Sequence, residues 1–174
     1  MAERVLVAID GANFAHQIRF FGDGNVGFDF AVLKNLLARL GVLQGVIYYT
    51  ARNPKDLGVD AFLNKLHELG FLVRHFSLRH YRDGTIKGDV DHELIVEMYD
   101  REREYDMLIL VSADGDYTPF VRSMQRRGKK VVVLSHTMAM AESFCRTPQP
   151  PLLTKSSSYL FQSYKGQSKF YKGK

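Results

Sequence analysis

Short, almost wholly apolar runs alternate with longer segments of helical spacing, and this alternation constrains the fold more than any other feature. The runs Met107–Val111 and Lys130–Leu134 are nearly all aliphatic, which is typical of strands buried on both faces of a parallel sheet. Further strands are predicted at Arg4–Ile9, Val42–Thr50 and Phe71–Leu78. The pattern therefore predicts one α/β domain with a mostly parallel central sheet.

Four segments between these runs carry apolar residues at helical spacing. They are Phe28–Leu40, Val59–Leu69, Asp89–Glu104 and Thr118–Arg127. Three of the four are followed by a glycine (Gly41, Gly70 and Gly128). Glycine is common where a helix ends, so these positions are predicted helix C-termini.

The composition changes at the proline-rich segment Thr147–Pro151, so we predict a domain over residues 1–146 and a tail over residues 147–174. The chain carries 24 Lys and Arg against 19 Asp and Glu. The tail holds five lysines and no Arg, Asp or Glu, which leaves 19 basic and 19 acidic residues in the body. A basic tail on a neutral body favours a polyanionic partner, nucleic acid first, although a solubilising tail would carry the same charge.

Aromatic residues interleave with the lysines of the tail. They are Tyr159, Phe161, Tyr164, Phe170 and Tyr171. Such a mixture suits stacking on single-stranded nucleic acid combined with phosphate contact. The alternative is that these rings pack on the body or on a second copy of the chain, as in a homodimer.

Targeting and redox features are few. No run approaches the roughly 18–20 apolar residues of a membrane span, and the first residues lack the apolar region and cleavage site of a signal peptide. Cys145 is the only cysteine, which excludes an internal disulfide and a multi-cysteine metal site. We expect a cytoplasmic protein without membrane association.

Acidic residues follow the predicted strands at three places. Asp10 ends the first apolar run, Asp114 and Asp116 follow the fourth, and Asp89 and Asp91 open a predicted helix. Each alone could be an ordinary helix cap. Because ligands of open parallel sheets bind at the carboxyl ends of the strands, we expect the acids to converge on one site.

Several carboxylates near one point repel one another unless a cation neutralises them. Oxygen ligands without His or Cys at metal spacing suit Mg²⁺ or Mn²⁺. Ions of this kind, held by carboxylates and substrate phosphate, serve in-line attack on phosphodiesters. The acids therefore predict phosphoryl chemistry on nucleic acid.

Three blocks, Val7–Phe14, Lys87–Asp91 and Val111–Val121, resemble in content and order the signature blocks of NYN domains. More narrowly, they resemble the LabA-like bacterial branch of the PIN-like nuclease superfamily. The resemblance implies a three-layer α/β/α PIN-like fold and a metal-dependent ribonuclease. It also implies that Asp10, Asp91, Asp114 and Asp116 are the metal-binding and catalytic acids, with Asn13 as the polar residue beside the first of them.

The chain departs from the family pattern at two positions of the third block. Ala113 stands where Gly is common, and Tyr117 stands where Phe is common. Neither change removes a candidate ligand.

Other polar residues near the blocks have two interpretations each. Lys87 is either an ordinary turn lysine or, as the resemblance favours, a residue that contacts the scissile phosphate or balances the charge of the acids. Ser112 and Thr118 are expected either to hold carboxylates or phosphate or to cap the following helix. Asp89 is predicted to be an N-cap. Glu97 lies six positions after Asp91 on the same predicted helix, which places it on a different side, so we expect it to face solvent.

Basic residues gather along the third predicted strand and the hairpin expected after it: Arg74, His75, Arg79, His80 and Arg82. They could follow a nucleic-acid backbone or form an ordinary solvated face. For the whole protein, the rivals of a ribonuclease are a non-catalytic RNA-binding or regulatory module with a vestigial metal site, and a metal-dependent DNA nuclease or phosphatase.

Overall fold

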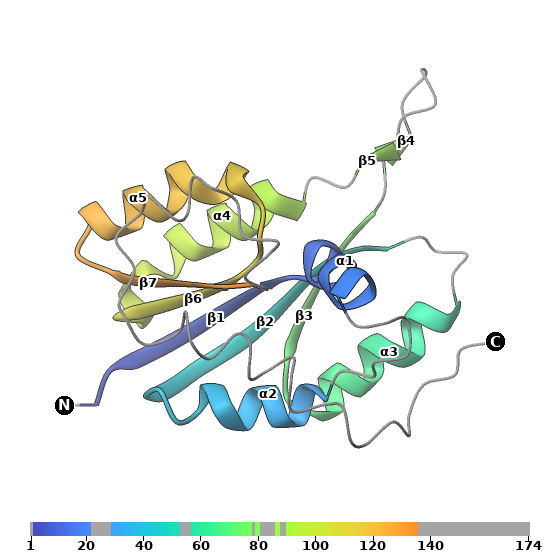
Figure 1. Ribbon diagram of the computed structural model, residues 1–174, viewed down its shortest axis with the longest axis horizontal. Helices are drawn as coiled ribbons and strands as arrows, with labels where there is room; N and C mark the ends of the chain where they lie inside the picture. Colours follow the sequence, from blue (N-terminus) through green and yellow to red (C-terminus); the bar gives the residue numbers. More distant parts are fainter. Residues whose placement is uncertain are drawn as a thin grey trace.

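The computed structural model describes residues 2–21, 29–52, 57–77, 79–80, 86–87 and 90–135. Its centre is a five-stranded sheet in the order β3-β2-β1-β6-β7, with every neighbouring pair parallel (Figure 1). The strands are β1 (Arg4–Asp10), β2 (Val42–Arg52), β3 (Leu72–Ser77), β6 (Met107–Val111) and β7 (Lys130–Leu134). The α/β class predicted from the sequence is confirmed.

Helices cover both faces of this sheet (Figure 1). On one face lie α1 (Gly11–Phe21), α2 (Phe30–Leu37) and α3 (Leu57–Glu68), and on the other lie α4 (Val90–Asp100) and α5 (Thr118–Arg126). Two short 3₁₀ helices, η1 (Glu102–Glu104) and η2 (Gly115–Tyr117), lead into β6 and α5. The molecule therefore has the expected three-layer α/β/α architecture.

The alternation of side chains along β1 determines where its last residue points. Val5, Val7 and Ile9 pack with the α1–α3 layer, whereas Leu6 and Ala8 pack with the α4–α5 layer. All five are completely buried. Because successive strand residues face opposite sides, Asp10 belongs to the α4–α5 face at the carboxyl end of the central strand.

The helix α1 is the one described α-helix that the sequence reasoning did not predict. It begins at Gly11 directly after β1. A Cβ at this position would lie 2.5 Å from the Tyr48 ring and 2.6 Å from the Tyr49 backbone oxygen, so the close approach of β2 requires glycine. The spacing of Phe14, which is buried, and Ile18, which packs against the same core, was the available signal.

The predicted helix ends differ in detail from the observed ones. Gly70 and Gly128 have φ of 76° and 81° and end their helices as expected. The helix predicted over 28–40 is shorter at both ends. Asp29 caps the start of α2 by accepting from the Ala31 and Val32 backbone N–H groups, and α2 ends at Leu37, so the prediction that Gly41 ends it was wrong. The prediction over 89–104 was too long, since α4 ends at Asp100 and η1 follows.

The expected hairpin is present as β4 (Arg79–His80), which pairs antiparallel with β5 (Ile86–Lys87). Its turn, Arg82, Asp89, Cys145 and the tail 147–174 lie outside the described residues. Within the described part of the chain, no helix is both long and apolar enough to cross a membrane.

Candidate acidic site

Asp10 is the buried centre of the candidate site, with 4% of its surface exposed. Its Oδ1 accepts from the backbone N–H of Asn13 at 3.1 Å. Its Oδ2 accepts from the Ser112 hydroxyl at 3.3 Å and from the Tyr117 hydroxyl at 3.4 Å. Residues from β1, α1 and the loop after β6 thus fix one carboxylate.

The environment of Asp10 opposes its ionisation. Burial raises the pKa of this carboxyl above its ordinary value, and the negative charges of Asp91 and Asp114 raise it further. The Asn13 and Ser112 hydrogen bonds oppose that rise only in part. A buried carboxylate facing two others is costly unless positive charge or a proton compensates it.

Tyr117 joins two of these acids. Its hydroxyl lies 3.4 Å from Asp10 Oδ2 and 3.2 Å from Asp91 Oδ1. Burial, followed by the charges of Asp10 and Asp91, raises the pKa of this phenol, so the group stays protonated and can donate. With one proton it donates to one carboxylate at a time. The sequence reasoning missed this role, although Tyr in place of the family's Phe was the signal.

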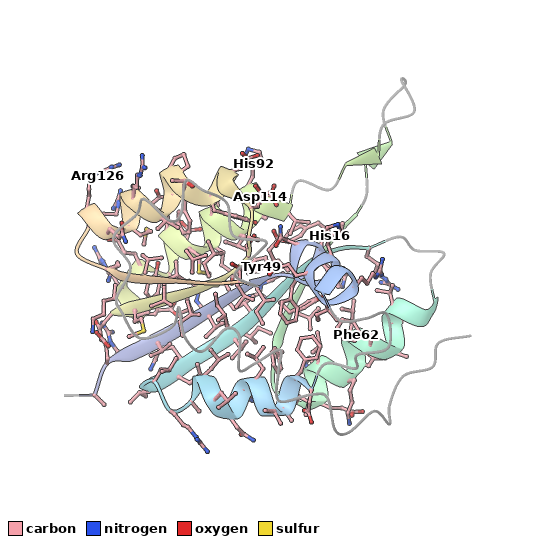
Figure 2. All side chains as sticks on the ribbon, viewed as in Figure 1. His16, Tyr49, Phe62, His92, Asp114 and Arg126 are labelled. Atoms are coloured by element: carbon pink, nitrogen blue, oxygen red, sulfur yellow. The ribbon has the colours of Figure 1, made fainter. Side chains whose placement is uncertain are left out.

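The loop after β6 is organised around Ser112, which is completely buried. The Ser112 hydroxyl accepts from the backbone N–H of Asp114 at 3.1 Å, and Asp114 Oδ1 accepts from the backbone N–H of Asp116 at 3.0 Å. Asp114 lies between the end of β6 and the start of α5 (Figure 2). Asp116 is exposed, whereas Asp114 is half-buried and its charge acts on Asp10.

Asn13 ties α1 to the loop after β6. Its Oδ1 accepts from the backbone N–H of Ala113 at 2.8 Å and from Gln17 Nε2 at 2.6 Å. Gln17 is 2% exposed. Sequence reasoning did not find Gln17, because it required α1 to be predicted first. The contacts of Asn13 show that it holds two parts of the site together.

Glu97 does not face solvent as expected, and that prediction was wrong. Its carboxylate accepts from the buried Tyr49 hydroxyl at 2.8 Å and from two Arg74 nitrogens at 3.0 Å each. Arg101 adds an ion pair at 3.5 Å. Burial alone would raise the pKa of Glu97, but the bonds from Arg74 and Tyr49 lower it below its ordinary value.

The sequence pattern described as the NYN domain matches residues 4–149. The chain belongs to the NYN family. It is 25% identical over 143 residues to the low amplitude and bright protein LabA of Synechococcus elongatus, covering 76% of this chain and 73% of that protein. A crystal structure of a protein of unknown function from Vibrio parahaemolyticus has the same fold, with a TM-score of 0.73, 24% identity and coverage of 82% of this chain and 86% of that one.

NYN domains are of the nuclease type, and this member keeps an oxygen-only set of acids. Within the described ranges, no three His, Cys, Asp or Glu side chains are grouped closely enough to hold a metal ion as they stand. The donor chemistry nevertheless fits a hard divalent cation, because two negative charges act on a buried third. The Tyr117 hydroxyl lies between Asp10 and Asp91, where it supplies one proton to the pair.

The candidate substrate residues of this NYN domain differ in what surrounds them. The Ser112 hydroxyl contacts Asp10, as one of its two interpretations predicted. Thr118 is 6% exposed and begins α5, whose N-cap residue, Tyr117, makes no side-chain capping bond. Lys87 lies in β5, and its side chain is outside the described residues. Their roles toward a substrate stay predictions.

Proposed function

We propose that this NYN protein is a Mg²⁺- or Mn²⁺-dependent ribonuclease that hydrolyses phosphodiester bonds of single-stranded RNA. One observation carries the proposal: Asp10 is buried at the carboxyl end of the central strand, with the charges of Asp91 and Asp114 acting on it. Carboxylates in such an arrangement repel one another, and a bound divalent ion would offset that repulsion. The nuclease character of the family supports the reaction class.

In this proposal the acids would bind the ion, and the neighbouring polar residues would position the acids. Asp10, Asp91 and Asp114 would hold the ion, with Asp116 completing the set at the rim. A bound ion of this kind activates water and stabilises charge on phosphate oxygens. Ser112 and Tyr117 orient Asp10 by hydrogen bonds, and Asn13 keeps the loop after β6 against α1.

Substrate contacts belong to the same proposal. We assign Asn13, Lys87, Ser112 and Thr118 to the surroundings of the scissile phosphate, and we place the protein in the cytoplasm. RNA in preference to DNA is supported by the family relationship. The domain division at residue 146 is also proposed, with the tail as an RNA-binding or packing segment and a homodimer as one way to pack it.

A specific contact favours a second candidate function. Because the Tyr117 hydroxyl can itself donate a proton to Asp10 or Asp91, the acids could serve a non-catalytic RNA-binding or regulatory module. In such a module the hydroxyl would remain in place when RNA binds, and divalent ions would be dispensable.

Incubation of the pure protein with labelled single-stranded RNA and DNA, each with Mg²⁺, Mn²⁺ or EDTA, tests the two functions. Ribonuclease activity requires metal-dependent RNA products that EDTA abolishes. RNA that is bound but left intact in every metal, across substrates of varied sequence, would favour the binding module. Cleavage of DNA alone would contradict the assignment to RNA.

A further inference from the structure

The helix α5 has one buried side and one basic side. Phe120, Val121 and Met124 are buried against the sheet, whereas Arg122 and Arg126 are exposed. The two arginines are four residues apart, so they lie on the same face and roughly 6 Å apart along the helix axis. The outer side of α5 therefore presents two guanidinium groups in a row.

This basic row is continuous with the acidic site. Asp116, Pro119, Arg122 and Arg126 are all exposed, and their spacing of three, three and four residues follows one side of the η2–α5 segment. Figure 2 shows Arg126 at the end of α5 opposite to Asp114. A strand that crosses the acidic site can thus pass along α5.

Arg122 and Arg126 have no hydrogen-bond or ion-pair partner within the described part of the chain, unlike the basic residues that follow them. Arg127 pairs with Glu102 at 2.9 Å and lies 5.1 Å from the centre of the Tyr99 ring. Lys129 donates to the Tyr105 backbone oxygen at 2.8 Å. Among the described cations of α5 and of the turn that follows it, the two α5 arginines are therefore the ones left to bind an external anion.

We propose that Arg122 and Arg126 form a phosphate-contact surface for single-stranded RNA, which leads the RNA backbone to the acidic site. This inference rests on the proposed function for its choice of RNA. Arginine presents a planar fork of donors that matches phosphate oxygens. The acidic site repels phosphate on its own, so affinity for RNA must come from nearby positive charge, and α5 provides it within a few helical turns.

The test measures RNA binding by the full chain carrying R122E/R126E. A short labelled single-stranded RNA is titrated in EDTA, so that no cleavage occurs, over a series of salt concentrations. We expect Kd to rise by about tenfold or more, the scale of one lost charged hydrogen bond. The slope of log K against log salt should become shallower by about 1.4, since each lost contact removes roughly 0.7 for a single strand.

Arg39 supplies the matched control, because it is an exposed arginine that follows α2 on the other face of the sheet and has no side-chain partner among the described residues. R39E should leave both Kd and slope within error of the wild type. R122Q/R126Q removes the charge without reversing it and should reproduce the change in slope. Thermal melting confirms that each variant is folded.

The outcomes separate this inference from the proposed ribonuclease. Unchanged RNA affinity and slope in R122E/R126E would overturn the α5 surface, even if the wild type cleaves RNA. Polyglutamate serves as a second probe. If R122E/R126E lost affinity for polyglutamate but kept its affinity for RNA, the α5 surface would bind an acidic protein partner, and this too would overturn the proposal. A wild type that cuts no RNA but loses affinity in R122E/R126E would defeat the nuclease proposal and leave the α5 surface supported.

Discussion

A single buried carboxylate, Asp10, has the greatest influence on the chemistry of this protein. We expect Asp10→Asn to lower RNA cleavage by at least about 100-fold, the scale on which loss of one charge-stabilising group acts. The same change should raise the melting temperature of the metal-free protein, because it removes a desolvated charge facing Asp91 and Asp114. Cleavage assays and thermal melting in EDTA measure the two effects.

Asp100→Asn is the control for that substitution, since Asp100 is exposed at the end of α4. It should change neither activity nor melting temperature. Full cleavage by Asp10→Asn would refute the assignment of the acidic site.

The Tyr117 hydroxyl can be removed while its buried ring is kept. Tyr117→Phe should lower the free energy of unfolding of the metal-free protein by about 1–3 kcal/mol, because Asp10 and Asp91 lose a shared donor. With that donor gone, the carboxylates attract a cation more strongly, so the rise in melting temperature caused by Mn²⁺ should be larger than in the wild type. An unchanged or smaller rise would show that the hydroxyl supports the ion instead of substituting for it.

Individual elements differ in how well the sequence specifies them. The strands Met107–Val111 and Lys130–Leu134 have the predicted bounds, because a strand buried on both faces is a continuous apolar run. The helix α1 was missed, since its short apolar pattern overlaps the residues that carry the site. The Glu97 contacts were missed because they join α4 to Tyr49 and Arg74, which are 48 and 23 residues away.

The Glu97 cluster attaches α4 to β2 and β3, and its contribution depends on pH. The pKa of Glu97 is lower in the folded protein than in the unfolded chain, where it is about 4.3. The stabilisation is therefore complete above the unfolded pKa and is lost as the pH falls through the folded pKa. Glu97→Gln should reduce the free energy of unfolding by about 1–3 kcal/mol at neutral pH, with the difference shrinking in acid.

Denaturant unfolding of both proteins between neutral and acid pH measures this dependence. Glu93→Gln is the matched control on the exposed side of α4 and should show little difference at any pH. If the difference in unfolding free energy between Glu97→Gln and the wild type stayed constant into acid, packing and not charge would account for the stabilisation by this cluster.

At the scale of the whole molecule, sheet order explains why Asp10 lies beside the loop that carries Asp114. The strands β1 and β6 are neighbours, with Ile9 paired to Val111, so Asp10 meets a loop about a hundred residues later in the chain. The parallel α/β pattern was enough to expect this meeting. It could not give the Tyr117 bridge or the Gln17 bond, because these depend on side-chain positions across elements that packing alone determines.

The net positive charge of the molecule lies in its tail, residues 147–174, so removing the tail should change RNA binding more than folding. A protein of residues 1–146 should fold with a melting temperature close to that of the full chain, because the cut follows β7 and removes no candidate ligand. The five lysines of the tail should each contribute roughly 0.7 to the salt dependence of RNA binding, so the slope should become shallower by up to about 3.5.

Cleavage at saturating RNA should persist in the shortened protein, since the acids belong to the body. The loss of RNA affinity caused by removing the tail should add to the loss caused by R122E/R126E, because the two sets of cations act on separate phosphates. If the shortened protein instead unfolds or changes its oligomeric state while its RNA affinity holds, the tail aromatics are packing residues. The charge of the tail would then serve solubility, and the phosphate contacts would be left to cations of the body such as Arg122 and Arg126.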